Sequence, residues 1–469
     1  MGTMKHLSAL DALFLQLETP ETPMHVGSVM ILEKPKAARG KKADAYGRFR
    51  DHFASRLHIA PVFTRRLAEM PLDLASPIWI DGAVDLDYHV GRLTLPKPGT
   101  TAQLEAAVAK LHEGPLDRSH PLWQFTVIDG LAGGDVAVYA KIHHAALDGQ
   151  GGVAVAQALL DTERSPKRGP GQGIARPRIA PTTARMLRDT LLHTVSQYGT
   201  LIKSLPALVK AAGRAGAVAY TAPQPKKSRM LGPPTPMNVA IGAKRVFVTR
   251  QIPLAETKEI ARRFEVTLND VVLATCAGAL RRQFAGNKAA LAKAMIGAVP
   301  ASLRLPGDTS KANDVTMMRV GLATQLADPL KRLAAIHTAS QRAKMITGSM
   351  KDSMPTDLPS LGIPWLMAAV SALYRKASRA DRLPALASLV ISNVPGPPVP
   401  LYMAGALLKS YFPVSIVIHG LAFNITILSY NGAMGYGLIA CKRAMPDLRT
   451  FSRNLQAAHD ELLALARKP

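Results

Sequence analysis

His143-His144-Ala145-Ala146-Leu147-Asp148-Gly149 is the stretch of this 469-residue chain that most constrains its fold and its chemistry. The seven residues read HHxxxDG and follow an apolar run, residues 136–142, in which Tyr139 and Lys141 occupy alternate positions, a pattern typical of a β-strand. Glycines then interrupt the pattern, and residues 153–160 predict a helix. Neighbouring side chains of a strand point to opposite faces. We therefore expect only one of the two histidines to reach a substrate, while the other supports it.

The histidine pair favours acid–base chemistry over two other roles. A neutral imidazole is a natural acceptor for the proton of a hydroxyl near neutral pH. The structural alternative is a pair of strand histidines bonded to backbone groups, but an aspartate and a glycine at fixed spacing after them favour function. The other alternative is a metal site. Adjacent histidines on opposite faces chelate poorly, and no third ligand stands at helical or hairpin spacing, so we expect no metal.

Length and composition predict a globular protein of two domains. A chain of 469 residues exceeds one ordinary hydrophobic core, and its 48% hydrophobic content argues against disorder. Predicted strands and helices mix without regular βαβ alternation, which predicts an α+β fold. Cys276 and Cys441 lie in separate apolar runs and predict buried thiols in a reducing compartment rather than a disulfide. We expect no signal peptide and no transmembrane helix, because no run reaches the ~18 apolar residues that cross a bilayer.

Charge and proline content separate a middle segment from the two ends. The formal net charge is +25, and residues 163–229 are strongly basic within Pro-rich flanks. We therefore divide the chain into an N-terminal domain (1–165), a basic helical connector (166–238) and a C-terminal domain (239–469). Residues 182–218 predict a basic amphipathic helix, and residues 363–374 predict an apolar helix with basic residues after it. Each helix suits either a membrane surface or a packed helix with solvated charges.

The positive charge suits three kinds of partner: nucleic acid, an anionic lipid surface or a phosphorylated cofactor. We expect no nucleic acid, because aromatic residues make up only 5% of the chain and no binding motif is present. A glycine-rich phosphate loop is also absent, so the sequence does not identify residues that would bind phosphates.

Several further segments, in this order, resemble one protein family along nearly the whole chain. In the first half they include Pro23-Met24-His25-Val26-Gly27 and Pro121-Leu122-Trp123 besides HHxxxDG. In the second half they include Asn269-Asp270, Val299-Pro300-Ala301-Ser302-Leu303-Arg304, Ser392-Asn393-Val394-Pro395-Gly396-Pro397 and Asn424-Ile425. Together they resemble the bacterial wax ester synthase/diacylglycerol acyltransferases. HHxxxDG alone is shared with a wider superfamily that includes chloramphenicol acetyltransferase, peptide-synthetase condensation domains and plant acyltransferases.

The resemblance implies a mixed α/β sandwich of two chloramphenicol-acetyltransferase-like domains with an active-site tunnel between them. It implies transfer of a long-chain acyl group from acyl-CoA, a co-substrate, to a fatty alcohol or a diacylglycerol, with no permanently bound cofactor and no metal. His144 would be the general base, without a covalent intermediate, and His143 would hold the backbone. By the same analogy, Asp148 points away from the substrate and pairs with an arginine, for which Arg304 is our candidate. Gly149 would permit a tight turn.

Four other polar residues are candidates for supporting or oxyanion groups. Asn269 and Asp270 precede an apolar helix, where they serve either as its N-cap or as part of a donor site at the tunnel. Asn393 precedes a rigid Pro-Gly turn and either belongs to that turn or lines the CoA or acyl channel. Asn424 stands in a very apolar strand, so its amide is either part of a buried network, which we favour, or an oxyanion donor.

Two other functions stay open from the sequence. One is acyl transfer from a carrier protein, which a basic surface would suit, although no carrier or adenylation domain adjoins. The other is a non-catalytic lipid-body or membrane-binding protein, against which the intact motif argues. On the leading hypothesis, we expect a cytoplasmic enzyme, peripheral on the inner membrane face or on lipid bodies. The sequence predicts no oligomeric state.

Overall fold

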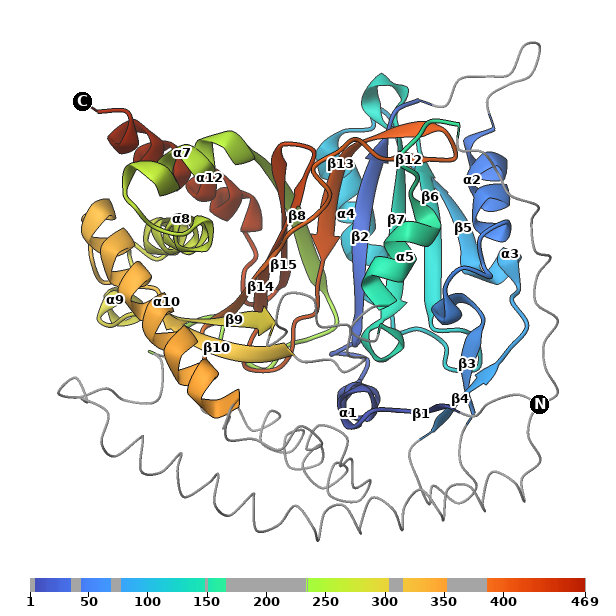
Figure 1. Cartoon of the computed structure of the whole chain (residues 1–469), viewed down its shortest axis with the longest axis horizontal. Coiled ribbons are helices and arrows are strands. Elements are labelled where there is room, and N and C mark those ends of the chain that lie inside the picture. The colour runs from blue at the N-terminus through green and yellow to red at the C-terminus, as the bar shows by residue number, and fades with distance from the viewer. Residues whose placement is uncertain are drawn as a thin grey trace, which may run out of the picture.

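The computed structural model describes residues 5–34, 44–68, 77–147, 151–165, 233, 235–302, 315–351 and 386–468. These residues form two halves that lie side by side, each built on a six-stranded sheet (Figure 1). Helices cover the sheets in both halves. The α+β class predicted from the irregular succession of strands and helices is confirmed.

The N-terminal half is built on a mixed sheet in the order β12-β13-β2-β7-β6-β5. Its strands from the first part of the chain are β2 (His25–Leu32), β5 (Val90–Thr94), β6 (Trp123–Asp129) and β7 (Val136–His143). Every residue of β7 is buried, because this central strand is covered on both faces. Its neighbours β2 and β6 both pair with it antiparallel, which places His25 opposite His143.

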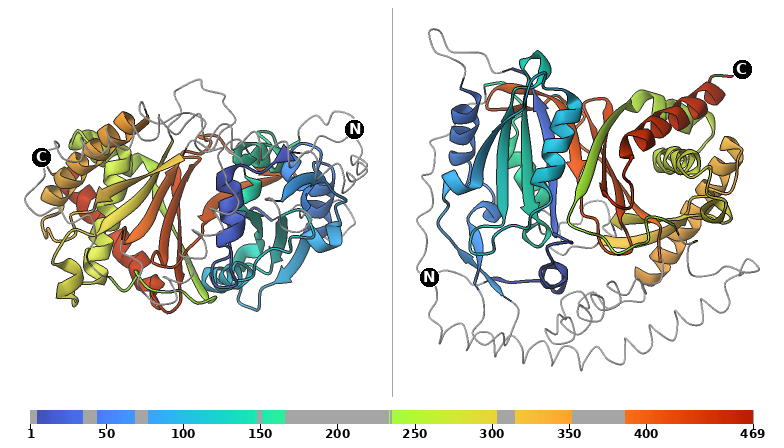
Figure 2. Two further views of the ribbon diagram at one scale, coloured as in Figure 1. Left: turned by 90° about the horizontal axis from the view of Figure 1, so that it is seen from below. Right: turned by 180° about the vertical axis from the view of Figure 1, so that it is seen from behind.

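Helices on the two faces of this sheet have different roles. On the outer face, α2 (Ala45–Ala54) and α5 (Gly151–Leu159) share a core with β7, and α3 (Leu86–His89) leads into β5. On the inner face, α4 (Thr101–Leu111) lies between the two halves, as Figure 2 shows from behind. α4 begins at a reciprocal pair of hydrogen bonds between Thr100 and Gln103, which satisfies the first free amides of the helix. Its Leu104 and Val108 pack with Tyr139 of β7 and Phe247 of the C-terminal half.

A small antiparallel sheet and helix α1 close the lower edge of the N-terminal half in Figure 1. The sheet contains β1 (Lys5–His6), β4 (Ile78–Asp81) and β3 (Arg65–Ala68), with the short helix η1 (Pro61–Phe63) before β3. In the sequence, Ser8 before an apolar-periodic run predicts the N-cap of a helix, and α1 (Ala9–Leu17) does begin there, with the Ser8 hydroxyl accepting a hydrogen bond from Asp11 N at 3.1 Å. Leu15 of α1 packs with Ala145, in the turn that follows β7.

The C-terminal half is built on a second mixed sheet, β10-β9-β11-β14-β15-β8. Its strands are β8 (Arg245–Pro253), β9 (Ile296–Ser302), β10 (Val315–Gly321), β11 (Leu389–Val394), β14 (Phe423–Tyr430) and β15 (Ala433–Cys441). The helices of this half gather on the face turned away from the N-terminal half (Figure 1). They are α7 (Leu254–Arg263), α8 (Leu268–Gln283), α9 (Lys288–Leu291), α10 (Pro329–Lys351) and α12 (Leu448–Ala466).

The second part of the chain contributes two strands to the N-terminal sheet. β12 (Tyr402–Met403) and β13 (Ala406–Val414) extend the N-terminal sheet, where β13 pairs antiparallel with β2, and the chain then returns to the C-terminal sheet as β14. In the sequence, the apolar residues 414–418 predict a strand of the C-terminal domain. That placement is wrong, because the strand ends at Val414 and belongs to the other sheet. The division of the chain into domains at 165 and 239 therefore stays a prediction. Residues 401–414 do not fit a division into continuous segments, because they lie in the second part of the chain but in the N-terminal sheet.

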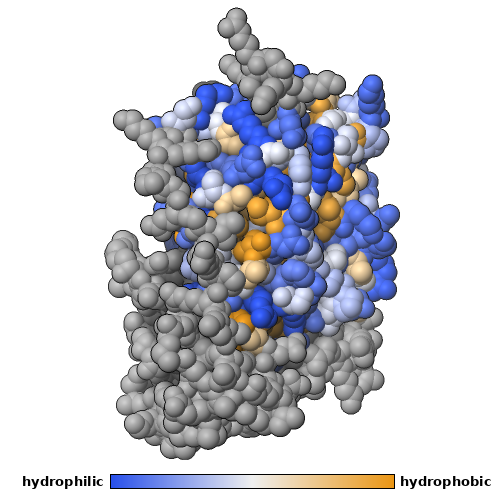
Figure 3. Space-filling view, turned by 90° about the vertical axis from the view of Figure 1, so that its right-hand side faces the viewer, coloured by the Kyte–Doolittle hydropathy of each residue, from blue (hydrophilic) through white to orange (hydrophobic). Residues whose placement is uncertain are grey.

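Two expected helices lie outside the described residues: 182–218 in the basic connector, and 363–374. None of the helices in the described ranges is long and apolar enough to span a bilayer. Figure 3 shows the side of the molecule that carries α2 and α3, where hydrophilic side chains cover most of the described surface and apolar areas between them are small.

The close crossing of β13 over β15 generates a testable prediction. A Cβ atom on Gly437 would lie 1.7 Å from Pro413 O, so alanine requires the two sheets to separate. We expect Gly437→Ala to lower the free energy of unfolding by about 2 kcal/mol, as overpacking does. Gly286→Ala is the matched control, because a Cβ there meets nothing within 4 Å. Urea unfolding of both variants measures the difference, and equal midpoints would contradict a tight crossing.

Candidate active site

The two adjacent histidines differ because the strand ends between them. β7 ends at His143, and the short helix η4 (His144–Ala146) begins at His144. His143 N donates to Leu122 O at 2.9 Å, and His144 N donates to Met24 O at 2.8 Å. The sequence treated both residues as strand positions with opposite faces. The rings do have separate environments, but a change of backbone conformation causes the separation, not strand alternation.

The His143 ring is completely buried and stabilises the turn. Its Nδ1 accepts a hydrogen bond from Ala145 N at 3.1 Å, so the ring caps the first amides of η4. Because Nδ1 accepts, a neutral ring carries its proton on Nε2. Nε2 lies 3.3 Å from Glu18 Oε1, close enough for an electrostatic contact although not aligned as a hydrogen bond.

Glu18 is a site residue that the sequence did not identify. Its Oε1 accepts from Met24 N at 3.0 Å, and its Oε2 accepts from the Arg118 guanidinium at 3.0 Å. Burial alone would raise the pKa of this carboxyl, but His143, Met24 N and Arg118 together hold it below its ordinary value. One sequence signal was available: Glu18 is the C-cap of α1, where the helix dipole disfavours a negative charge. A carboxylate in that position indicates a compensating partner.

His144 has the properties of a neutral base. Its ring stacks on Phe14 of α1, with centroids 4.1 Å apart and planes at 24°. Burial, and next the neighbouring charge of His143, lower the pKa of His144 to about 4, so the ring is neutral near pH 7. Nδ1 has no hydrogen-bond partner among the described residues. Nδ1 is itself buried, but the ring as a whole is only half-buried, and a neutral imidazole in that position is suited to accept a proton.

A buried polar network lies behind the histidine pair. His25, opposite His143 on β2, places Nε2 3.0 Å from His112 O, and the two rings meet edge to face at 4.4 Å. His112 Nε2 lies 3.1 Å from Ser415 O, and its Nδ1 lies 2.7 Å from the Tyr139 hydroxyl. Burial lowers the pKa of His112 to about 3, so the neutral ring donates from Nε2 and accepts from Tyr139. The network therefore joins the N-terminal sheet to the segment that connects β13 and β14.

Asn424 belongs to the continuation of this network. Its Nδ2 donates to Ser415 Oγ at 3.2 Å and to Ile416 O at 3.1 Å, and its Oδ1 accepts from Thr426 Oγ1 at 2.8 Å. Both amide hydrogens are thus used within the chain. This arrangement supports the network role over the oxyanion role for Asn424.

Asn269 and Asp270 lie in α8 of the C-terminal half. The prediction that they form the N-cap is wrong by two residues, because α8 begins after Thr267. Thr267 and Asp270 form the reciprocal capping pair, a signature present in the sequence as T-x-x-D. Asp270 Oδ2 also lies 2.7 Å from His337 Nδ1 of α10. Asp270 is thus engaged within the C-terminal helical layer, and Asn269 occupies the first turn of the same helix.

Of the remaining candidate residues, only Asn393 lies within the described part of the chain. Asn393 is half-buried near the end of β11, where it is in register with Ile427, and Gly396 N donates to Ser429 Oγ in the turn that follows. Asp148, Gly149 and Arg304 lie outside the described residues, so the proposed Asp148–Arg304 pair stays a prediction.

The described residues offer neither a reactive thiol nor a metal site. Both Cys276 and Cys441 are buried and unpaired, as predicted, and burial raises the pKa of Cys276 to about 12, which keeps it a thiol. Within the ranges that the structure describes, no group of three His, Cys, Asp or Glu residues is placed to hold a metal ion.

Comparison with known proteins identifies the family. The model of the wax ester synthase/diacylglycerol acyltransferase catalytic domain matches residues 7–272, and the model of the WS/DGAT C-terminal domain matches residues 311–463. The chain belongs to this family. It is therefore an acyltransferase, and HHxxxDG lies within the catalytic-domain match.

Relatives and solved structures cover almost the whole chain. A putative diacylglycerol O-acyltransferase of Mycobacterium tuberculosis strain H37Rv is 33% identical over 459 residues, 97% of this chain and 99% of the relative. The wax ester synthase/diacylglycerol acyltransferase from Marinobacter aquaeolei VT8 matches with a TM-score of 0.69 and 27% identity, over 98% of this chain and 99% of that one. The first condensation domain of the calcium-dependent antibiotic synthetase shares the fold, with a TM-score of 0.57, 11% identity and coverage of 100% and 97%. The predicted two-domain architecture of the superfamily is confirmed.

The contacts of Glu18 generate a prediction about stability. Glu18→Ala leaves the Arg118 guanidinium, Met24 N and the His143 ring without their common acceptor. We expect this to lower the free energy of unfolding by about 1–2 kcal/mol, the cost of leaving buried polar groups without an acceptor, because the partly exposed Arg118 guanidinium can turn to water. Glu18→Gln keeps one acceptor without the charge and should lose about half as much. Denaturant unfolding measures the stability of the wild type and of the two variants. A Glu18→Ala protein as stable as the wild type would contradict this role for the carboxylate.

Proposed function

We propose that this acyltransferase moves a long-chain acyl group from acyl-CoA to a fatty alcohol or a diacylglycerol, with His144 as the general base. The observation that carries the proposal is the environment of His144: a neutral, half-buried ring on a rigid turn, stacked on Phe14. Family membership supports the reaction class. The positive net charge supports binding of an anionic co-substrate and contact with an anionic membrane or lipid-body surface.

The reaction requires one proton transfer in each direction. His144 takes the proton of the acceptor hydroxyl while that oxygen attacks the thioester carbonyl carbon. The C–O bond forms, the carbonyl electrons move to oxygen, and a tetrahedral intermediate results. When the carbonyl re-forms, the C–S bond breaks and the imidazolium gives its proton to the departing thiolate. The products are an ester and CoA thiol, and no covalent intermediate forms on the chain.

Other residues of the motif would orient His144 rather than react. His143 caps the turn with Nδ1, and Glu18 is placed to fix the His143 ring. We assign Asp148, Gly149 and Arg304 supporting roles by resemblance to the superfamily. Asn269 and Asn393 stay candidates for lining or oxyanion groups.

Replacement of His144 tests the function directly. Thiol release from palmitoyl-CoA should depend on added hexadecanol or diacylglycerol in the wild type and fall by about a thousandfold or more in His144→Ala, because general-base catalysis contributes ~10²–10⁴-fold. His58→Ala is the matched control, since His58 is exposed on the outer side of the N-terminal half. Release that never depends on either acceptor would overturn the proposal and favour a carrier-protein donor or a lipid-binding role.

The depressed pKa of His144 predicts an unusual pH profile. The base must be neutral, and its pKa of about 4 keeps it neutral well below pH 6.5. We expect kcat/KM to stay constant from pH 7.5 down to about 5 and to fall only below that. In Phe14→Ala, solvent reaches the ring, so the acid limb should move up toward pH 6.5. Phe14→Leu keeps an apolar cover and should resemble wild type; acid limbs near pH 6.5 in all three proteins would show that burial does not set this pKa.

A further inference from the structure

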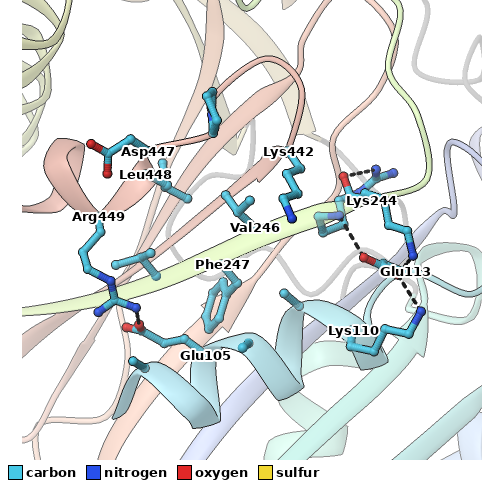
Figure 4. Close-up of a pocket in the computed structure, with 16 residues that line it drawn as sticks. Glu105, Lys110, Glu113, Lys244, Val246, Phe247, Lys442, Asp447, Leu448 and Arg449 are labelled. Carbon is cyan, nitrogen blue, oxygen red and sulfur yellow. Dashed lines mark hydrogen bonds and ion pairs between the residues drawn. The ribbon is translucent and has the colours of Figure 1, made fainter. Parts of the chain in front are cut away.

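A pocket of about 590 Å³ lies between the two halves, where α4, the start of β8 and the segment before α12 meet (Figure 4). Its lining is apolar along β8 and at the start of α12, through Val246, Phe247 and Leu448. Charged side chains stand around this apolar part at two ends, as Figure 4 shows. The reaction described above assigns no task to this pocket.

One end of the pocket holds an excess of positive charge. Lys110, Lys244, Arg245 and Lys442 surround a single carboxylate, Glu113. Glu113 Oε2 lies 3.0 Å from Lys110 Nζ and 3.5 Å from Lys244 Nζ, while Oε1 accepts from Arg245 N at 3.2 Å. Within the described part of the chain, Lys442 has no carboxylate at ion-pair distance. One negative charge thus faces four positive ones.

Strand pairing fixes the position of these cations. Arg245 and Cys441 are partners where β8 and β15 begin and end, and Lys442 N donates to Lys244 O at 3.0 Å, so Lys244 and Lys442 are neighbours. The Arg245 guanidinium is buried and donates to carbonyl oxygens, among them Gly242 O and Glu21 O, rather than to a carboxylate. A buried guanidinium without a paired anion favours an anionic ligand nearby.

The opposite end of the pocket is neutralised within the chain. Arg449 Nη2 lies 2.9 Å from Glu105 Oε2, and Asp447 caps α12 by accepting from Thr450 N at 3.0 Å. The excess charge is therefore local to the end that contains Lys110, Lys244 and Lys442. A ligand with one multiply charged end and one less polar part would match this distribution of charge.

The positive end adjoins the segments that support the histidine pair. Arg245 donates to Glu21 O, in the chain between Glu18 and His25. Glu113 directly follows His112, whose ring packs on His25. Two short stretches of chain thus connect the positive end of the pocket to the residues around the histidine pair.

We propose that this pocket binds the phosphorylated nucleotide end of acyl-CoA, with the terminal phosphomonoester among Lys110, Lys244 and Lys442. An ammonium group offers three donors, and the contacts with Glu113 leave donors on each lysine for phosphate oxygens. Val246 is the partly exposed apolar side chain that the base would contact, while Phe247 and Leu448 are buried beneath the lining. The inference rests on the proposed function, because it concerns the donor of that reaction.

The test compares CoA with 3′-dephospho-CoA, which lacks the phosphomonoester. Calorimetry on the full chain should show about tenfold tighter binding of CoA by the wild type. In Lys244→Ala/Lys442→Ala, CoA affinity should fall to that of dephospho-CoA, whose own affinity changes by less than threefold. With palmitoyl-CoA the loss should appear in KM rather than kcat. Lys288→Ala is the control variant. It removes a lysine charge from α9, outside the pocket, and should bind both ligands as the wild type does.

Several outcomes would overturn the inference without touching the proposed function. An active wild type that binds both ligands equally, or a double variant that keeps the preference for CoA, would show that the phosphate binds elsewhere. A double variant that loses binding to phosphatidylglycerol vesicles but not to CoA would assign the pocket to a lipid headgroup. Conversely, a lysine-dependent preference for CoA in a wild type without acyl transfer would support the pocket while the proposed function fails.

Discussion

The buried carboxylate of Glu18 is the constraint around which the turn with the two histidines is arranged. Removing a carboxylate from water is costly unless donors replace the water. Here two donors and one electrostatic contact come from separate parts of the chain: Met24 N before β2, Arg118 before β6, and the His143 ring at the end of β7. Meeting the needs of one charge therefore brings three segments to one point. The position of His144 follows, since its amide bonds to Met24 O and its ring rests on α1, the helix that ends at Glu18.

The second constraint is that the N-terminal sheet is completed by strands from the second part of the chain. β13 comes from the second part of the chain but pairs with β2, and Gly437 of β15 allows the backbone of β13 to approach. His112 and Asn424 then bond to the segment between β13 and β14 from opposite sides. Polar groups buried at such a junction favour one relative position, because any shift leaves them unpaired. The geometry behind the histidines is thus set by both halves.

The sequence predicted the features that local patterns encode. Ser8 as an N-cap, the apolar run that became β7 and the two buried thiols all depend on near neighbours in the chain. The predictions from the sequence failed where contacts between residues far apart in the chain determine the structure. The strand ending at Val414 was assigned to the wrong sheet, because periodicity reports burial but not the pairing partner. The Thr267 cap was readable from the sequence and was missed. The groups around Glu18 include Arg118 and His143, which are 100 or more residues away in the chain, and no local pattern reports them.

In the mechanism that we propose, the environment of His144 has a consequence for the order of events. A base with a pKa of about 4 is far too weak to deprotonate an alcohol before attack. The proton must therefore move as the C–O bond forms. At that moment negative charge develops on the carbonyl oxygen, and a nearby negative charge raises the pKa of an imidazole, more so where water is excluded. The burial that keeps His144 neutral in the resting enzyme thus strengthens its interaction with the developing oxyanion, so that His144 becomes an effective base only when the substrates react.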